Sequence, residues 1–139
     1  MLSHLIYVSN RAQNCTQAEI EKILESCRKN NSKHDITGVL LYSETKFVQY
    51  IEGKYTEIMQ LYDKIKTDKR HTNAVLLTSA PIQERSFPSW QMGAKTFDTA
   101  SIDFKTDVSE DDRKIFNAML SGKSAEENKA INLIKKFFR

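Results

Sequence analysis

The stretch TGVLLYSETKFVQYIEG, residues 37–53, organises the chain because it predicts two strands joined by a short polar turn. We expect these strands at 36–42 and 47–52, with Gly53 ending the second. Gln49 is unusual, since it interrupts an otherwise apolar strand. A buried amide needs hydrogen-bond partners, and leaving them unmade costs about 1–3 kcal/mol. A flat polar group lying against Gln49 would supply those partners.

A further strand is predicted upstream at residues 2–9, LSHLIYVS, which is rich in β-forming side chains. Alternation places Leu5, Tyr7 and Ser9 on one face of this strand. Tyr7 is therefore a phenol on a central strand. Taken alone, it is most simply interpreted as a core tyrosine whose hydroxyl bonds a backbone group.

A helix is predicted to begin at Thr16, because Thr16 and Glu19 fit the capping-box pattern. It is expected to end near Lys29, where Asn30 and Asn31 follow. The two asparagines have two interpretations. They can form a helix cap and turn, since asparagine tolerates left-handed geometry, or they can present two carboxamides to a ligand. The apolar stripe of this helix comprises Ile20, Ile23, Leu24 and Cys27.

Residues 55–67 predict a second amphipathic helix, followed by strands at 74–79 and within 90–97. The order of elements is that of an α+β, ferredoxin-like βαββαβ fold with an extra strand. We expect a five-stranded mixed sheet with both helices on one face, because the crossovers are right-handed. A ligand could lie between the two helices. The inward positions of the second helix are Ile58, Leu61, Tyr62 and Ile65.

The C-terminal part predicts a polar linker at 98–108 and two helices that begin at Ser109 and Ser124. We expect this helix pair to pack on the other face of the sheet, since an apolar sheet face needs cover. The predicted division is a core at 1–97 and a linker with a two-helix cap at 98–139. Alternatively, the apolar end at Phe137 and Phe138 meets a partner.

The composition excludes several classes of function. The net charge is +3 over 139 residues and the charges interleave, so no basic stripe predicts nucleic-acid binding. No apolar run reaches the ~20 residues of a membrane span, and the first residues do not form a secretory signal. Cys15 and Cys27 match no metal or disulfide pattern and favour a cytoplasmic setting. No metal site is expected, because His4, His34 and His71 are scattered.

Six groups of residues, taken in order, resemble the BLUF family of blue-light sensors that use FAD. The resemblance covers residues 1–97, and the C-terminal helix pair is similar to that of short, stand-alone members. The groups are Tyr7, Asn30-Asn31, ITGVLLY at 36–42, F-x-Q-x-x-E-G at 47–53, D-x-R-H at 68–71 and S-F-x-x-W-x-M-G at 86–93.

The resemblance implies a role for each matching residue. Tyr7 matches the tyrosine that donates an electron and then a proton to the excited flavin, and Gln49 matches the glutamine between that tyrosine and the flavin. Trp90 and Met92 match a relay pair, one of which approaches Gln49. The implied flavin-binding residues are Tyr7, Ile23, Arg28, Asn30, Asn31, Phe47, Gln49, Lys64, Ile65, Asp68 and Arg70. Of these, Ile23 and Ile65 would sandwich the ring system, and Arg28, Lys64, Asp68 and Arg70 would contact the ribityl chain and phosphates.

The expected function is that of a non-enzymatic photoreceptor, in which Gln49 rearranges its hydrogen bonds after light absorption. FAD is the implied cofactor, and FMN or riboflavin would fit the same ring site. The output would be a change in a protein partner or in a homo-oligomer. Two alternatives stay open: a small flavin-dependent reductase, and a ferredoxin-like interaction domain without a cofactor.

Overall fold

The computed structural model describes residues 1–97, 110–123 and 126–138. The predicted linker at 98–108, and the predicted helix starts at Ser109 and Ser124, lie outside the described residues. The elements in order are β1 (Leu2–Arg11), α1 (Gln17–His34), β2 (Thr37–Tyr42), β3 (Lys46–Lys54), α2 (Tyr55–Lys66), β4 (His71–Pro81), β5 (Gly93–Thr96), α3 (Glu110–Leu120) and α4 (Glu127–Phe137).

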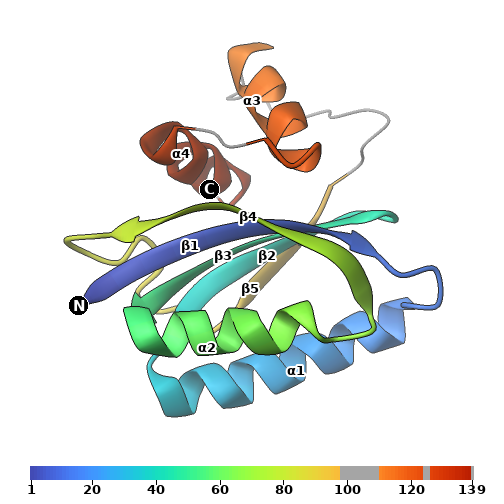
Figure 1. Cartoon of the computed structure of the whole chain (residues 1–139), viewed down its shortest axis with the longest axis horizontal. Coiled ribbons are helices and arrows are strands. Elements are labelled where there is room, and N and C mark those ends of the chain that lie inside the picture. The colour runs from blue at the N-terminus through green and yellow to red at the C-terminus, as the bar shows by residue number, and fades with distance from the viewer. Residues whose placement is uncertain (98–109, 124–125, 139) are drawn as a thin grey trace.

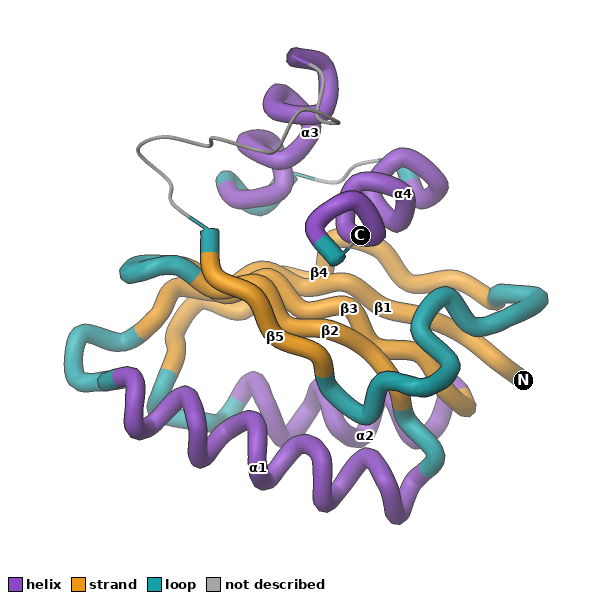
Figure 2. The backbone as a smooth tube through the Cα atoms, turned by 180° about the vertical axis from the view of Figure 1, so that it is seen from behind, coloured by secondary structure: helices purple, strands orange, loops and turns teal. Residues whose placement is uncertain are grey.

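The strands form one five-stranded mixed sheet in the order β4-β1-β3-β2-β5, and Figure 2 labels each of them. β1 pairs antiparallel with both β3 and β4, and β2 pairs antiparallel with β3. β5 pairs parallel with β2, which makes the sheet mixed. The predicted α+β, ferredoxin-like order with an extra strand is confirmed.

The sheet lies between two helical layers (Figure 1). α1 and α2 cover one face, and α3 and α4 cover the other, as the sequence predicted. Because successive strand residues point to opposite faces, β1 contributes Leu5 and Tyr7 to one core and Ile6 and Val8 to the other. Each face of the sheet therefore has a hydrophobic core of its own.

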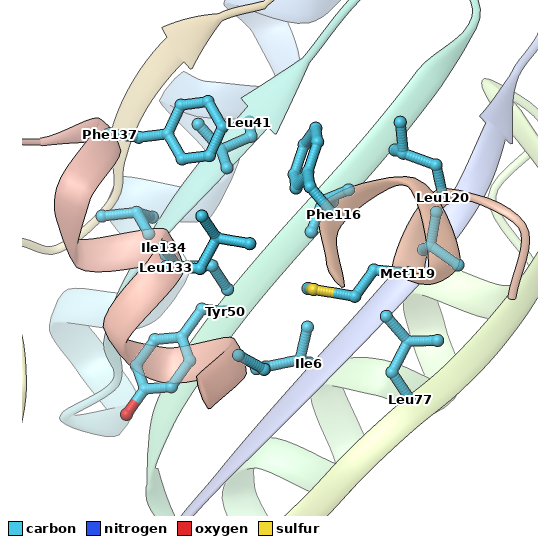
Figure 3. Packing of buried hydrophobic residues seen from close by; sticks show 14 of the residues in the cluster. Ile6, Leu41, Tyr50, Leu77, Phe116, Met119, Leu120, Leu133, Ile134 and Phe137 are labelled. Atoms are coloured by element: carbon cyan, nitrogen blue, oxygen red, sulfur yellow. The ribbon is translucent and has the colours of Figure 1, made fainter. Parts of the chain in front are cut away.

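The core beneath α3 and α4 is built from aromatic and branched side chains (Figure 3). Phe116 and Met119 of α3 are fully buried there, together with Leu133 and Ile134 of α4. They pack on Tyr50 and on apolar residues of β1, β2 and β4. Burial of this kind contributes roughly 1.5–3 kcal/mol per large apolar side chain, which explains why this helix pair covers the sheet.

α1 continues past the predicted end, so the interpretation of Asn30 and Asn31 as a terminating cap is wrong. Thr16 caps the helix as predicted, since its side chain accepts a hydrogen bond from the Glu19 amide. The C-cap is Asp35, whose φ of 54° is left-handed and whose amide bonds the Asn31 carbonyl. The helix continues because Asn31 uses its side chain for tertiary bonding instead of a local turn.

One other predicted boundary is wrong. Gly53 does not end β3, because it pairs with Ser3 inside the sheet and the strand continues to Lys54. A Cβ at this position would lie 3.2 Å from the Asp35 carbonyl oxygen, so the glycine accommodates a close approach of the α1–β2 turn. α4 begins at Glu127, with Glu126 as its N-cap.

Glu52, on β3, ties the segment before β5 to the sheet. Its carboxylate is 0% exposed and accepts hydrogen bonds from two hydroxyls and two backbone amides. The donors are Thr37 Oγ1, Tyr50 OH, and the amides of Ser86 and Phe87, at 2.7–3.0 Å. These bonds satisfy the buried charge and hold residues 86 and 87 against the sheet.

We predict that Glu52→Gln lowers the free energy of unfolding by about 2–3 kcal/mol, because an amide nitrogen then faces hydrogen-bond donors. Urea unfolding followed by circular dichroism measures the change. Glu25→Gln, at an exposed position of α1, is the control and should stay within about 0.5 kcal/mol of the wild type. Equal stabilities for the two variants would contradict the anchoring role of Glu52.

Candidate functional site

A cleft of about 270 Å³ opens between α1, α2 and the sheet. Its walls are apolar and its rim is polar, and its size is close to the lower end of small-molecule sites. Of the eleven predicted flavin-binding residues, nine line it: Tyr7, Ile23, Asn30, Phe47, Gln49, Lys64, Ile65, Asp68 and Arg70.

The pairing of β1 with β3 places Tyr7 directly opposite Gln49 at the floor of the cleft. The Tyr7 hydroxyl donates a short hydrogen bond to Gln49 Oε1. On its other side, Gln49 Nε2 donates to the Met92 sulfur at 3.4 Å. Gln49 therefore has partners on both ends of its amide, one on β1 and one in the segment that leads into β5.

Burial decides the protonation of Tyr7 and Cys27, two titratable groups that line the cleft with Gln49. The pKa of Tyr7 is raised well above its ordinary value, chiefly by burial, with smaller contributions from Cys27, Tyr62 and Asp68. Tyr7 is therefore a neutral phenol that can donate to Gln49. Burial likewise raises the pKa of the Cys27 thiol to about 11, so this cysteine is protonated near neutral pH.

Met92, and not Trp90, is the member of the relay pair that approaches Gln49. Met92 is 3% exposed and packs with the core on the cleft side, whereas Trp90 is 38% exposed. Trp90 contacts Phe87 and Phe138, and its ring lies over Gly93, where a Cβ would come within 2.4 Å. The sequence did not decide which of Trp90 and Met92 approaches Gln49, and the structure shows that Met92 does.

Two residues of α1 hold the backbone of this same segment. Arg28 Nε donates to the Met92 carbonyl at 3.1 Å, and Asn31 Nδ2 donates to the Gln91 carbonyl at 2.6 Å. Neither residue is among those that line the cleft. Asn31 is 0% exposed, and its Oδ1 has no hydrogen-bond partner among the described residues. An unpaired buried acceptor of this kind fits a ligand that donates an N–H.

Charged residues gather where α2 ends and β4 begins. Asp68 and Arg70 form a two-pronged ion pair, with Arg70 Nη2 2.5 Å and Nε 3.0 Å from the two carboxylate oxygens. The hydrogen bonds from Arg70 hold the pKa of Asp68 below its usual range, despite partial burial. Lys64 and Arg70 give this rim cationic groups that suit an anionic ligand.

Several cleft residues were not singled out by the sequence. His71 begins β4 and bonds Ser9 Oγ and the Ile65 carbonyl. Its place in D-x-R-H was the signal that could have found it. Ser26 and Cys27 follow from the helical spacing with Ile23 and Asn30. The cleft residues absent from the predicted flavin contacts are Ser26, Cys27, Leu40, Leu61 and His71, although Cys27 and Leu61 were placed on the inward faces of their helices.

The residues present fit a flavin ring system. An isoalloxazine has a flat apolar body, which suits branched side chains such as Ile23 and Ile65 from the two helices. Its polar edge alternates donors and acceptors, which suits carboxamides such as those of Gln49 and Asn30 in the cleft lining. No group of three metal-ligating side chains occurs in the described parts of the chain.

Comparison with known proteins agrees with this geometry. A family model described as "Sensors of blue-light using FAD" matches residues 2–93. The chain belongs to the BLUF family. Its function is therefore that of a blue-light photoreceptor, and its cofactor is the flavin that this family uses. The resemblance drawn from the sequence is confirmed.

Curated relatives carry this BLUF region within much longer proteins. Photoactivated adenylate cyclase subunit beta from Euglena longa is 36% identical over 96 residues, which are 68% of this chain and 11% of the relative. The blue light- and temperature-regulated antirepressor BluF from Escherichia coli is 32% identical over 98 residues, 70% of this chain and 24% of the relative. The chain thus spans about a tenth to a quarter of the length of these relatives.

Solved BLUF structures share the fold. The dark-state structure of BlrB, a BLUF protein, is 35% identical with a TM-score of 0.67, over 68% of this chain and 72% of that chain. The photo-activated state of BlsA is similar over 99% of this chain and 94% of that chain, with a TM-score of 0.77. At 24% identity, this second likeness shows the fold alone, including the C-terminal helices.

We predict that Asn31→Ala weakens flavin binding about tenfold, since it removes the orphaned Oδ1 and the donor to the Gln91 carbonyl. Titration of the flavin-free protein with FAD, followed by quenching of flavin fluorescence, measures the affinity. Asn132→Ala, at an exposed position of α4, is the matched control and should bind as the wild type does. Unchanged affinity in Asn31→Ala would contradict a contact between Asn31 and the cofactor.

We predict that Arg70→Gln raises the pKa of Asp68 toward its ordinary value, because Arg70 is the main cause of the lowered pKa. A carboxyl whose pKa is lower in the folded state stabilises the fold above its unfolded pKa, and this contribution is lost as pH falls through the folded pKa. The part of the free energy of unfolding that is lost at acidic pH because Asp68 becomes protonated should therefore be smaller in the variant. Carbon-13 NMR of the aspartate carboxyl groups from about pH 7 to about pH 2 measures the pKa.

Lys69→Gln is the control for this titration, because Lys69 is an exposed neighbour outside the cleft lining. It should leave the titration of Asp68 as in the wild type. An Asp68 pKa that does not change in Arg70→Gln would show that another group lowers it.

Proposed function

We propose that Tyr7 and Gln49 are the photochemical pair of this receptor and that Met92 receives their signal. The observation that carries the proposal is the chain of contacts from Tyr7 OH through the Gln49 amide to the Met92 sulfur. All three side chains are buried, so each relies on the others for its polar partners. A change at the amide must therefore change the bonding of both neighbours.

The cleft residues hold FAD in this proposal. Ile23 and Ile65 pack on the two faces of the ring system, and Asn30 and Asn31 contact its polar edge. Lys64, Asp68 and Arg70 surround the ribityl chain and phosphates, where the ion pair fixes the Arg70 guanidinium. Arg28 acts through the Met92 carbonyl, which it already bonds. When bound, FAD supplies the absorption of blue light and accepts an electron.

Tyr7 supplies the electron and the proton in this mechanism. Its neutral phenol donates to Gln49 Oε1, so the proton has a direct path to the amide. Gln49 then changes its bonding, either by rotation or by forming the imidic tautomer. Rotation exchanges Oε1 and Nε2, so the Met92 sulfur loses its N–H donor. The imidic tautomer instead turns Oε1 into a donor and leaves Nε2 with a single N–H.

The signal leaves through the segment that joins β4 to β5. Arg28 and Asn31 hold its backbone at residues 91 and 92, one or two residues from Trp90. Trp90 and Phe87 pack on Phe138, just after α4, with ring centroids 5.3 and 6.0 Å apart respectively. Movement of Met92 can thus alter how the C-terminal helices pack on the sheet. A local change in hydrogen bonding would then switch a larger part of the structure.

The output is a change in protein contacts, either with a partner protein or within a homo-oligomer. We assign the photosensor to residues 1–97 and the linker and cap to 98–139. We also propose that the protein is not an enzyme. The names of the relatives support signalling to an effector, since they include a photoactivated cyclase and a light-regulated antirepressor. No helix among the described residues is both long and apolar enough to cross a bilayer, and we propose a cytoplasmic location.

We predict that blue light shifts the flavin absorption of the purified protein reversibly to longer wavelength. Tyr7→Phe and Gln49→Leu should keep the flavin bound but abolish the shift, because each removes one end of the hydrogen bond. Tyr62→Phe is the matched control. Its ring lies 5.5 Å from that of Tyr7, but it is not bonded to Gln49, so the shift should persist.

A normal light response in Tyr7→Phe or Gln49→Leu would refute the roles given to these residues. Steady oxidation of NADH by the flavin-loaded protein would instead favour the reductase alternative. A folded protein that takes up no flavin would favour the interaction domain.

A further inference from the structure

Buried polar side chains also gather on the sheet face opposite the cleft. Strand alternation places His4 of β1, together with Tyr50 and Glu52 of β3, beneath the C-terminal helices. His4 and Glu52 are direct partners in the β1–β3 register. Of these three side chains only Glu52 holds the segment before β5, through the amides of Ser86 and Phe87.

The polar groups of this cluster are not equally satisfied. Glu52 accepts four hydrogen bonds, including one of 2.8 Å from Tyr50 OH. His4 is 0% exposed, yet neither ring nitrogen has a hydrogen-bond partner among the described residues. Its ring stacks on Tyr50 with the centroids 5.7 Å apart and the planes 13° from parallel. Its nitrogens therefore lack well-formed hydrogen bonds, although the Glu127 carboxylate lies near Nδ1, and this is unusual because buried polar groups are nearly always bonded.

His4 lies where α4 meets the sheet. Glu127, the first residue of α4, places its carboxylate 3.5 Å from His4 Nδ1. Farther along α4, Leu133 and Ile134 pack in the same core as Tyr50 (Figure 3). The Glu127 side chain is 37% exposed, so water reaches the edge of this contact. The burial of His4 therefore depends on α4 staying docked on the sheet.

The surroundings of His4 oppose its protonation. The titratable groups that face the ring are Glu127 from α4, and Glu52 and Tyr50 from β3, while β4 contributes the Ala80 carbonyl. The two glutamates favour the charged imidazole, but burial disfavours it more and lowers the pKa of His4. Release of α4 would expose the ring to water and return this pKa toward its ordinary value.

We propose that His4 is an acid-sensitive latch, in which its protonation loosens the docking of α4 on the sheet. The released form binds the proton more readily, so docking is strongest while His4 is neutral and weakens as pH falls below the ordinary histidine range. The latch acts in the dark and needs no change in the cleft. It gives acidity a second route to the helices that the light signal is proposed to reach.

Hydrogen exchange of the α4 amides tests the latch in the flavin-loaded full chain, kept in the dark. Mass spectrometry compares protection at about pH 7.5 and about pH 5.5, after correction for the intrinsic exchange rates. We expect the protection factors of the α4 amides to fall at least about threefold at the lower pH. Titration of a single group can change them by at most about tenfold per pH unit. The first turns of α1, residues 17–24 on the opposite face, serve as the internal reference and should not change, whereas α2 is unsuitable because His34 and His71 bond it.

Two variants make this comparison decisive. His4→Phe keeps a flat ring against Tyr50 but cannot titrate, so protection of α4 should become independent of pH. Glu127→Gln removes an attraction that favours the protonated ring, so α4 should lose more protection at low pH than in the wild type. A wild type that shows no change, or a His4→Phe variant that keeps the full pH dependence, would overturn the proposal.

If His4→Phe does not fold, NMR titration of the His4 ring in the wild type provides the deciding measurement. A pKa below the ordinary value of about 6.5 supports the latch, and a pKa at or above that value overturns it.

Discussion

The hydrogen bond from Tyr7 to Gln49 depends on the register between β1 and β3, and the rest of the site depends on that register. A slip by one residue would turn Gln49 toward the C-terminal helices and bring Tyr50 into the cleft. Register is strongly specified here because both faces of β3 are buried, with Phe47, Gln49 and Ile51 on one side and Val48 and Tyr50 on the other. The photochemical pair is thus positioned by the packing of the whole sheet.

The sheet separates two environments that the segment before β5 connects. On one side, Met92 accepts the Gln49 hydrogen bond within the core of the cleft. On the other side, Trp90 and Phe87 pack on Phe138 near the end of α4. Glu52 fixes the start of this segment and Arg28 and Asn31 fix its end. A short, well-anchored segment can transmit a change in one hydrogen bond because its ends cannot absorb the displacement.

The sequence was sufficient to predict the order of the elements and most of the cleft lining. Periodicity identified the two-sided strands and the helix stripes, and family motifs identified Tyr7 and Gln49. The helix end at Asn30–Asn31 was predicted wrongly, because local preference for a cap was overridden by the tertiary bond from Asn31 to the Gln91 carbonyl. The choice between Met92 and Trp90 could not be predicted, since it depends on how a loop folds over Gly93. His71 was not assigned to the cleft, because its place just after the second helix has a sufficient local explanation.

The central claim is that the Gln49 amide links the cleft to Met92. Methyl NMR with carbon-13-labelled methionine tests it directly, because the chain has 4 methionines and Met92→Leu assigns the relevant signal. The Met92 methyl is bonded to the sulfur that accepts from Gln49, so its resonance should shift under blue light and recover in the dark. The shift should be absent in Gln49→Leu. A wild-type Met92 resonance that stays unchanged while the flavin absorption shifts would contradict the account.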